Sequence, residues 1–245
     1  MPIGLGASLG IGGGRSATSS GAPDGGGGRA PFIPNAKSVL FDGTDDTMTL
    51  ASELNFTGTF TFSIWVKPVS GDEGFISVGD SGMSGPWLDW YGAAYGNRWV
   101  LRNMGAISGA AGAATSGSWY HLLVIRDSSN VVKLYADGSQ TGSSSSFTGT
   151  AEFSTFAARS AGGATALNGY LDEIAFWDSD QTSNIAAIYN SGVAGDIWEV
   201  SPPLHWYRLG DINGGSGATI ADIGSAADND GTLNNGPTYT TDVPS

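Results

Sequence analysis

The chain has no cysteine, few charged side chains and no long apolar segment, and each absence excludes a class of protein. Without cysteine no disulfide can stabilise the fold, so an apolar core must do so, and 245 residues suffice for one sizeable domain with tails. No segment approaches the roughly 20 consecutive apolar residues of a membrane span. The stretch MPIGLGASLGIGGG lacks the basic start and continuous apolar core of a secretory signal. We therefore expect a soluble protein made in the cytoplasm.

Basic residues are scarce as well. Ten Lys and Arg stand against 23 Asp and Glu, which gives a net charge of −13 and a pI near 4.2. A chain of this charge repels phosphate backbones, so we expect no nucleic-acid partner and no membrane partner. The two histidines, His121 and His205, fall in strand-like segments, where a structural role is expected. The glycine-rich start lacks the lysine of a phosphate-binding loop.

Residues that favour strands and turns are abundant. Short segments alternate apolar and polar residues, and Gly, Asn, Asp and Ser separate them. The clearest is Phe60–Lys67, which Pro68 is expected to end. The other predicted strands are Ser38–Phe41, Thr47–Leu50, Phe75–Val78, Trp87–Tyr91, Arg98–Arg102, Tyr120–Arg126, Val131–Ala136 and Asp172–Trp177. This pattern predicts an all-β fold, a two-sheet antiparallel jelly-roll sandwich.

Three further elements complete the predicted organisation. A short helix is expected after Thr182 or Ser183 as its cap, with Gly192 as its stop. Residues 1–34 are mostly Gly, Ser, Ala and Pro and bury too little apolar surface to order alone. They form either a flexible arm or an anchor that orders against neighbouring subunits, and the spaced apolar residues favour the anchor. Residues 35–195 form the predicted sandwich.

Four segments in order resemble the laminin-G-like, concanavalin A-like lectin/glucanase group: VLFDGTDDTMTL, TFSIWVKP, WYHLLVIRDSSNVVKLYADG and LNGYLDEIAFWD. The resemblance implies a jelly roll of two sheets. The C-terminal extension, residues 196–245, holds a piece that resembles the usual opening of such a domain, so the chain looks permuted. We expect this extension to complete the sandwich or to pair with a neighbouring subunit. The glycine-rich head, the permuted sandwich and the DVPS ending are similar to structural proteins of marine tailed phages.

Glucanases of this group carry Glu-x-Asp-x-x-Glu on one strand, which supplies the catalytic acid and the nucleophile. This chain has five Glu residues, and none lies four or five positions from another. Asp172 and Glu173 are adjacent, so in a regular strand they point to opposite faces and cannot act on one bond. We therefore predict that the protein is not an enzyme and has no catalytic residues.

The resemblance also implies a calcium site, because relatives commonly use an Asp on the late strand and groups near the FDG turn. The matching positions are Asp172 in GYLDEI and Asp42, Asp45 and Asp46 in FDGTDD. Calcium takes six to eight oxygen ligands, which such residues supply. Structural Ca²⁺ is the candidate cofactor. The alternative is that these carboxylates make turn hydrogen bonds or are solvated.

Aromatic residues cluster between residues 87 and 99, where a sugar could stack on exposed rings beside polar groups. The predicted carbohydrate-binding residues are Trp87, Asp89, Trp90, Tyr91, Tyr95, Asn97 and Trp99. Because residues alternate between the two faces of a strand, one face must be core, and core packing is expected to explain most of these rings. Trp65 is expected to face the same concave surface.

Two functions of different class follow. The first is a non-enzymatic virion structural, decoration or fibre-associated protein at the virion surface. Its arm would contact other virion subunits, it would form a homo-oligomer, and its lectin-like domain would aid adsorption to host glycans. The alternative is a soluble calcium-dependent carbohydrate-binding module. A glycoside hydrolase is the least favoured interpretation.

Overall fold

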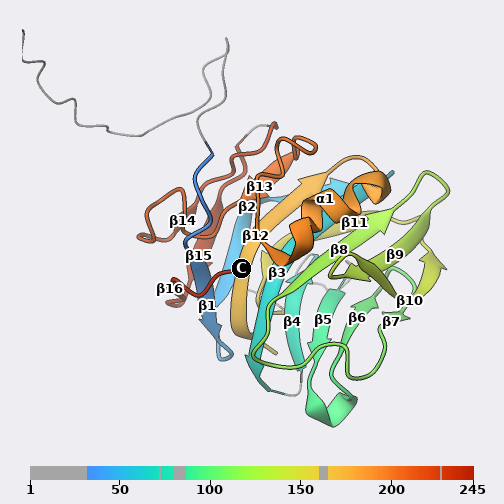
Figure 1. Ribbon diagram of the computed structural model, residues 1–245, viewed down its shortest axis with the longest axis horizontal. Coiled ribbons are helices and arrows are strands. Elements are labelled where there is room, and N and C mark those ends of the chain that lie inside the picture. Colours follow the sequence, from blue (N-terminus) through green and yellow to red (C-terminus); the bar gives the residue numbers. More distant parts are fainter. Residues whose placement is uncertain (1–31, 72, 80–86, 160–164, 227) are drawn as a thin grey trace, which may run out of the picture. The chain divides into compact units, whose positions relative to one another are not determined.

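The computed structural model describes residues 32–71, 73–79, 87–159, 165–226 and 228–245, apart from the side chains of Phe75 and Val78. From Ile33 to Ser245 the chain forms two antiparallel sheets packed face to face, as Figure 1 shows. The predicted all-β sandwich with one short helix is confirmed. The predicted arm lies outside the described residues except for its last three, 32–34. No helix of the described part is long and apolar enough to cross a membrane.

The first sheet is built around its longest strands. Its order is β10 (Ser139–Ser146), β9 (Val131–Ala136), β8 (Tyr120–Arg126), β3 (Phe60–Ser70), β12 (Asn168–Trp177), β1 (Ser38–Asp42) and β16 (Thr238–Thr240), and β13 (His205–Tyr207) also pairs with β12. One side of β12 pairs with β3. Along its other side β1 pairs with residues 168–171 and β13 with residues 174–176, so two segments far apart in the sequence share one strand.

The second sheet carries the aromatic cluster of the sequence. Its order is β14 (Thr219–Ile220), β15 (Gly231–Asn234), β2 (Thr47–Phe56), β11 (Ala151–Phe156), β4 (Glu73–Val78), β5 (Trp87–Tyr91), β6 (Arg98–Arg102) and β7 (Ile107–Ser108). The turn η1 (Ala93–Tyr95) joins β5 to β6. The strands β13 to β16 of the C-terminal extension thus lie in both sheets of their own chain.

The alternation in β3 shows why these segments form strands. Phe60, Phe62, Ile64 and Val66 occupy every second position and are fully buried between the sheets. The Phe62 ring stacks on Phe176 of β12 with centroids 4.9 Å apart. Burial of each such side chain contributes on the order of 1.5–3 kcal/mol, and a strand with this pattern can bury all four on one face.

The outer face of β3 is buried as well, because a helix covers it (Figure 1). The helix α1 (Ile185–Tyr189) lies between the turns η2 (Thr182–Asn184) and η3 (Asn190–Gly192). Trp65 is only 4% exposed, and its ring centroid lies 4.9 Å from that of His121 and 6.1 Å from that of Tyr189. The expectation for Trp65 was therefore wrong: it lies under the helix, in the other sheet from β5 and β6.

Two predicted boundaries also differ from the structure. Pro68 does not end β3, which continues to Ser70. The Pro68 carbonyl accepts a hydrogen bond from the N–H of Gly117, a residue that precedes β8 in the chain. Pairing of β3 with β8 stops at Val66, so β8 has no carbonyl opposite Pro68 that would require the missing proline N–H. The helix ends at Tyr189, where Asn190 adopts the left-handed region with φ of 47°, ahead of the predicted stop at Gly192.

A β-bulge in β12 holds a buried network of charges. Asp172 pairs with Trp65 and Ala175 with Ser63, so two residues of β12 oppose one of β3, and Glu173 has a φ of 45°. The expectation that Asp172 and Glu173 point to opposite faces was wrong, since both carboxylates interact in one buried cluster. Burial raises the pKa of both groups, that of Glu173 to about 7.

Arg208 connects this cluster to the segment before β1 and to the loop after β13. Its Nε lies 2.8 Å from Glu173 Oε1 and its Nη2 lies 2.9 Å from Asp211 Oδ2, while Nη1 donates to the Ile33 carbonyl. Asp211 Oδ1 accepts hydrogen bonds from the backbone N–H groups of residues 36 and 37 at 3.0 and 2.9 Å. Asn35 Nδ2 donates to Asp172 Oδ2 at 2.9 Å. The segment before β1 and the loop after β13 are therefore joined through β12.

Candidate functional site

The strands β5 and β6 form a ladder in which Trp90 pairs with Trp99 and Tyr91 with Arg98. One face of this ladder belongs to the core. Trp90 is 2% exposed and donates from Nε1 to the Ala114 carbonyl at 2.7 Å, and Trp99 is fully buried against Tyr120. Because their ring faces are covered, these two predicted residues cannot present a platform to a sugar.

The opposite face of the ladder carries the accessible rings. Trp87 and Tyr91 are half-buried, and Tyr95, on the turn η1, is 50% exposed. The tight connection brings Tyr95 back over the sheet, so that its ring centroid lies 5.3 Å from that of Tyr91. Asn97 contributes through its backbone, because its φ of 48° and its N–H bond to the Gly92 carbonyl close the turn. We call Trp87, Tyr91, Tyr95, Arg98 and Arg102 the aromatic face.

Arg102 organises the centre of the aromatic face. Its guanidinium carbon lies 5.6 Å from the Trp87 ring centroid and 5.1 Å from that of Tyr91, within the range of cation–π attraction. Its Nε is 2.8 Å from Asp89 Oδ2 and its Nη2 is 2.5 Å from Glu73 Oε1 on β4. Arg102 therefore fixes the positions of the two rings and forms ion pairs with both carboxylates.

Asp89 is a fully buried acid on this side of the sheet. Burial raises its pKa to about 7, Arg102 opposes this rise, and the nearby Glu73 adds to it. The predicted residue Asp89 thus lies below the aromatic face and holds Arg102. It does not reach the surface where a ligand would bind.

The carbohydrate-binding residues predicted from the sequence did not include Arg98, Arg102 or Glu73. The signal was present, because the strands β5 and β6 have the predicted bounds and pair residue by residue. That pairing places Arg102 opposite Trp87 and Arg98 opposite Tyr91. Glu73 could not be found in this way. Residues 80–86 separate β4 from β5 in the sequence, and the pairing register of these two strands does not follow from the sequence.

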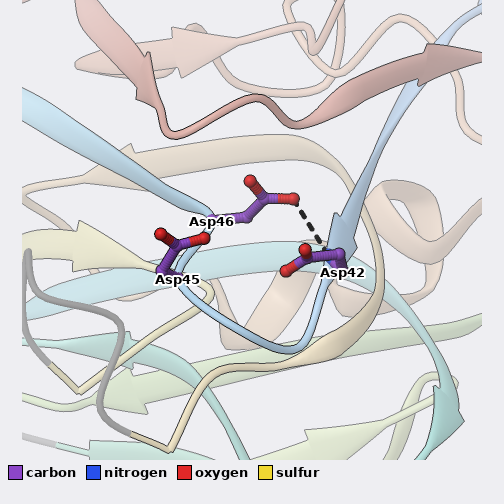
Figure 2. A group of neighbouring side chains, drawn as sticks. All are labelled: Asp42, Asp45 and Asp46. Atoms are coloured by element: carbon purple, nitrogen blue, oxygen red, sulfur yellow. Dashed lines mark hydrogen bonds between the residues drawn. The ribbon is translucent and has the colours of Figure 1, made fainter.

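A second cluster lies in the turn between β1 and β2. One carboxylate oxygen from each of Asp42, Asp45 and Asp46 lies within 4.8 Å of the others, and Figure 2 shows the three groups turned towards one another. Asp42 Oδ1 accepts from Thr44 N–H at 2.7 Å, and Asp46 Oδ2 accepts from Asp42 N–H at 3.0 Å. Burial raises the pKa of Asp46, and the neighbouring negative charges of Asp42 and Asp45 add to the rise. Three carboxylates this close together could supply part of the six to eight oxygen ligands that calcium takes.

Asp172 is not part of this cluster. The antiparallel register pairs Asp42 with Asn168 and Val39 with Leu171, so Asp172 lies near the opposite end of β1. There its Oδ1 accepts from Glu173 N–H at 2.9 Å, inside the buried Arg208 network. The structure brings together three of the four predicted metal ligands and places the fourth in a structural role.

The sequence matches the Concanavalin A-like lectin/glucanases superfamily over residues 42–184, more than half of its length. The chain belongs to this superfamily. Comparison with curated protein sequences gave no significant match.

Solved structures of this superfamily fold share the architecture. A Bacteroides ovatus protein whose name proposes carbohydrate binding is 18% identical, with a TM-score of 0.62. The match covers 86% of this chain and 62% of that protein, so the present chain spans less than two thirds of its length. A heptameric SAP-like pentraxin from Limulus polyphemus is also 18% identical, with a TM-score of 0.52, and the match covers 65% of this chain and 84% of the pentraxin. At these identities the likeness concerns the fold.

The raised pKa of Asp89 predicts a specific pH dependence of stability. The folded state holds a proton on Asp89 up to a pKa of about 7, whereas the unfolded chain releases it near 3.8, the ordinary pKa of an aspartate. The free energy of unfolding should therefore fall between about pH 4 and 7, by at most ~1.4 kcal/mol per pH unit from this group. Asp89→Asn should remove this part of the slope, as measured by chemical denaturation across that range. Asp178→Asn, at an exposed position, is the charge-matched control. An identical slope in Asp89→Asn and wild type would contradict the assignment.

Proposed function

We propose that the chain is a non-enzymatic carbohydrate-binding domain and that the aromatic face is its binding site. The observation that carries the proposal is the exposed Tyr95 ring beside Tyr91 and Arg98 on an outer sheet face. Sugar rings stack their C–H faces on aromatic rings, and nearby guanidinium groups bind hydroxyl and acidic oxygens. The name of the Bacteroides ovatus protein of similar fold supports the same class of ligand.

Three of the described groups that could act as catalysts support the non-enzymatic part of the proposal. Asp172 and Glu173 are buried, and Glu173 is bound by Arg208. His121 is also buried, and burial lowers its pKa to about 3, so it stays neutral beside Ser63 Oγ at 2.8 Å from its Nε2. A general acid or base has to reach the scissile bond, and these three side chains do not reach the surface.

We further propose that Asp42, Asp45 and Asp46 hold a structural Ca²⁺. The ion would relieve the repulsion among three carboxylates that lie within 4.8 Å of one another. Asp42 ends β1 and Thr47 begins β2, so an ion in this turn would fix the crossing from one sheet to the other. Its contribution would be to stability, because the turn is not part of the aromatic face.

Glycan binding through the aromatic face predicts a clear result on a glycan array. The wild-type protein should bind a defined set of glycans, and Tyr95→Ala should weaken that binding roughly threefold to tenfold, since one stacking surface is lost. Tyr170→Ala, which removes a half-buried tyrosine from the other sheet, is the matched control and should bind like wild type. An array without bound glycans, or equal binding by Tyr95→Ala, would refute the proposal.

Calcium binding predicts a shift of the unfolding temperature. Calcium at about 100 times its Kd stabilises a folded protein by about 2.7 kcal/mol, which corresponds to several degrees for a domain of this size. The wild-type Tm should rise with CaCl₂ and fall again with chelator. Asp45→Asn should abolish the shift, and the exposed Asp178→Asn should retain it. The site is wrong if Asp45→Asn keeps the full shift, or if wild type shows none.

A virion role at the surface of a phage is a second proposal, favoured by the glycine-rich residues 1–34 and by the resemblance of the C-terminal extension to the usual opening of such a domain. In this role the arm would bind other virion subunits, and the domain would contact host glycans as a homo-oligomer. Mass spectrometry of purified particles tests it: the chain should copurify with intact particles, and deletion of residues 1–34 should remove it from them. Absence from particles, or retention of the deleted form, would rule the role out.

A further inference from the structure

Accessible positive charge is concentrated at the aromatic face. The described residues include eight Lys and Arg: Lys37, Lys67, Arg98, Arg102, Arg126, Lys133, Arg159 and Arg208. Arg126 and Arg208 are buried in the interior. Of the six others, Arg98 and Arg102 belong to the aromatic face, and the Arg159 guanidinium lies 5.4 Å from the Trp87 ring centroid. In a chain of net charge −13, half of these accessible cations surround one set of rings.

Among the described residues, the two carboxylates beside the rings pair with Arg102 and not with Arg98. Glu73 and Asp89 both bind Arg102, at 2.5 and 2.8 Å. Burial also raises the pKa of Asp89 to about 7, so a proton on this group lowers the negative charge below the rings. Arg98 therefore keeps its charge for an anionic ligand, which the acidic remainder of the protein repels.

Arg98 has a guanidinium group available beside the rings. It is half-buried, its Nε donates to the Tyr95 carbonyl at 2.8 Å, and its Nη1 donates to Ser108 Oγ at the long distance of 3.4 Å. Within the described part of the chain no carboxylate forms an ion pair with it. The bond to Tyr95 fixes the side chain next to the exposed ring, and the cross-strand pairing fixes it next to Tyr91. A planar guanidinium in that position can bind a carboxylate or sulfate with two parallel hydrogen bonds.

We propose that the aromatic face selects anionic saccharides, whose rings stack on Tyr95 and Tyr91 while a carboxylate or sulfate substituent binds Arg98. Arg98 is the specificity-determining residue. This inference rests on the proposed carbohydrate binding and adds the chemical class of the glycan. Carboxylate and sulfate share a pair of negatively charged oxygens that can accept two hydrogen bonds from the guanidinium fork.

A glycan array with matched acidic and neutral members tests the selection. It should carry oligogalacturonate and its uncharged methyl ester, and sulfated dextran and unmodified dextran, in addition to sialylated and neutral glycans of equal backbone. Acidic members should bind at least ~10-fold more tightly than their neutral counterparts, as expected for a charge-assisted hydrogen-bonded pair. The uronate and sulfate arms show which oxyanion is preferred.

Variants assign the selection to Arg98. Arg98→Gln should lower the affinity for acidic glycans by ~10-fold or more and leave neutral glycans unchanged. Lys133→Gln makes the same change in net charge on β9 of the other sheet and should behave like wild type. Arg98→Lys retains the charge without the fork and should fall between them, which keeps the test valid if Arg98→Gln unfolds.

The outcomes separate this inference from the function on which it rests. Binding to neutral glycans that depends on Tyr95 and not on Arg98 would overturn the inference and leave carbohydrate binding intact. Equal loss in Arg98→Gln and Lys133→Gln would overturn it too, because a general charge effect would then explain the affinity. Absence of any bound glycan would refute both.

Discussion

The buried ion pair between Arg208 and Glu173 is a constraint that several separate segments of the sandwich share. Both side chains are buried, and isolated buried charges cost several kcal/mol each unless a partner compensates them. Arg208 also binds Asp211 and the Ile33 carbonyl, so one guanidinium joins the start of the domain, the loop after β13 and the bulge of β12. Backbone pairing holds β1 and β13 on β12, and Arg208 adds a side-chain connection between the segments that flank these two strands.

Arginine side chains have one role in the interior of this protein and another at its surface. Arg126 and Arg208 act in the interior, and Arg126 donates to the carbonyls of residues 56, 58 and 149 with no carboxylate partner among them. Arg98 and Arg102 act at the surface, where guanidinium groups lie beside aromatic rings. The fold thus separates cations that hold segments together from cations that remain accessible, and the second set defines the candidate binding site.

Much of the fold follows from the sequence, because burial on one sheet face imposes a period of two. Trp87–Tyr91, Arg98–Arg102, Tyr120–Arg126 and Val131–Ala136 form strands with the predicted bounds. The strand β10, SQTGSSSS, was not predicted, since its residues are mostly exposed and backbone pairing with β9 alone makes it a strand. A Cβ at Gly142 would lie 2.6 Å from the Ser108 carbonyl oxygen, so close approach to β7 requires glycine there.

The candidate site was predicted in part: Tyr91 and Tyr95 lie on the outer face, whereas Trp90 and Trp99 lie in the core.

The sequence by itself determined the sandwich, the superfamily resemblance and the acidic turn Asp42–Asp46, because each depends on residues close together in the chain or on a regular alternation. Tertiary structure alone decided which tryptophans are accessible, that α1 covers Trp65, and that Asp172 and Glu173 share one buried cluster. These facts depend on a bulge and on contacts between residues more than 30 positions apart, such as Arg208 with Glu173. The local sequence pattern does not predict such contacts, because the side chains meet only after the sheets have formed.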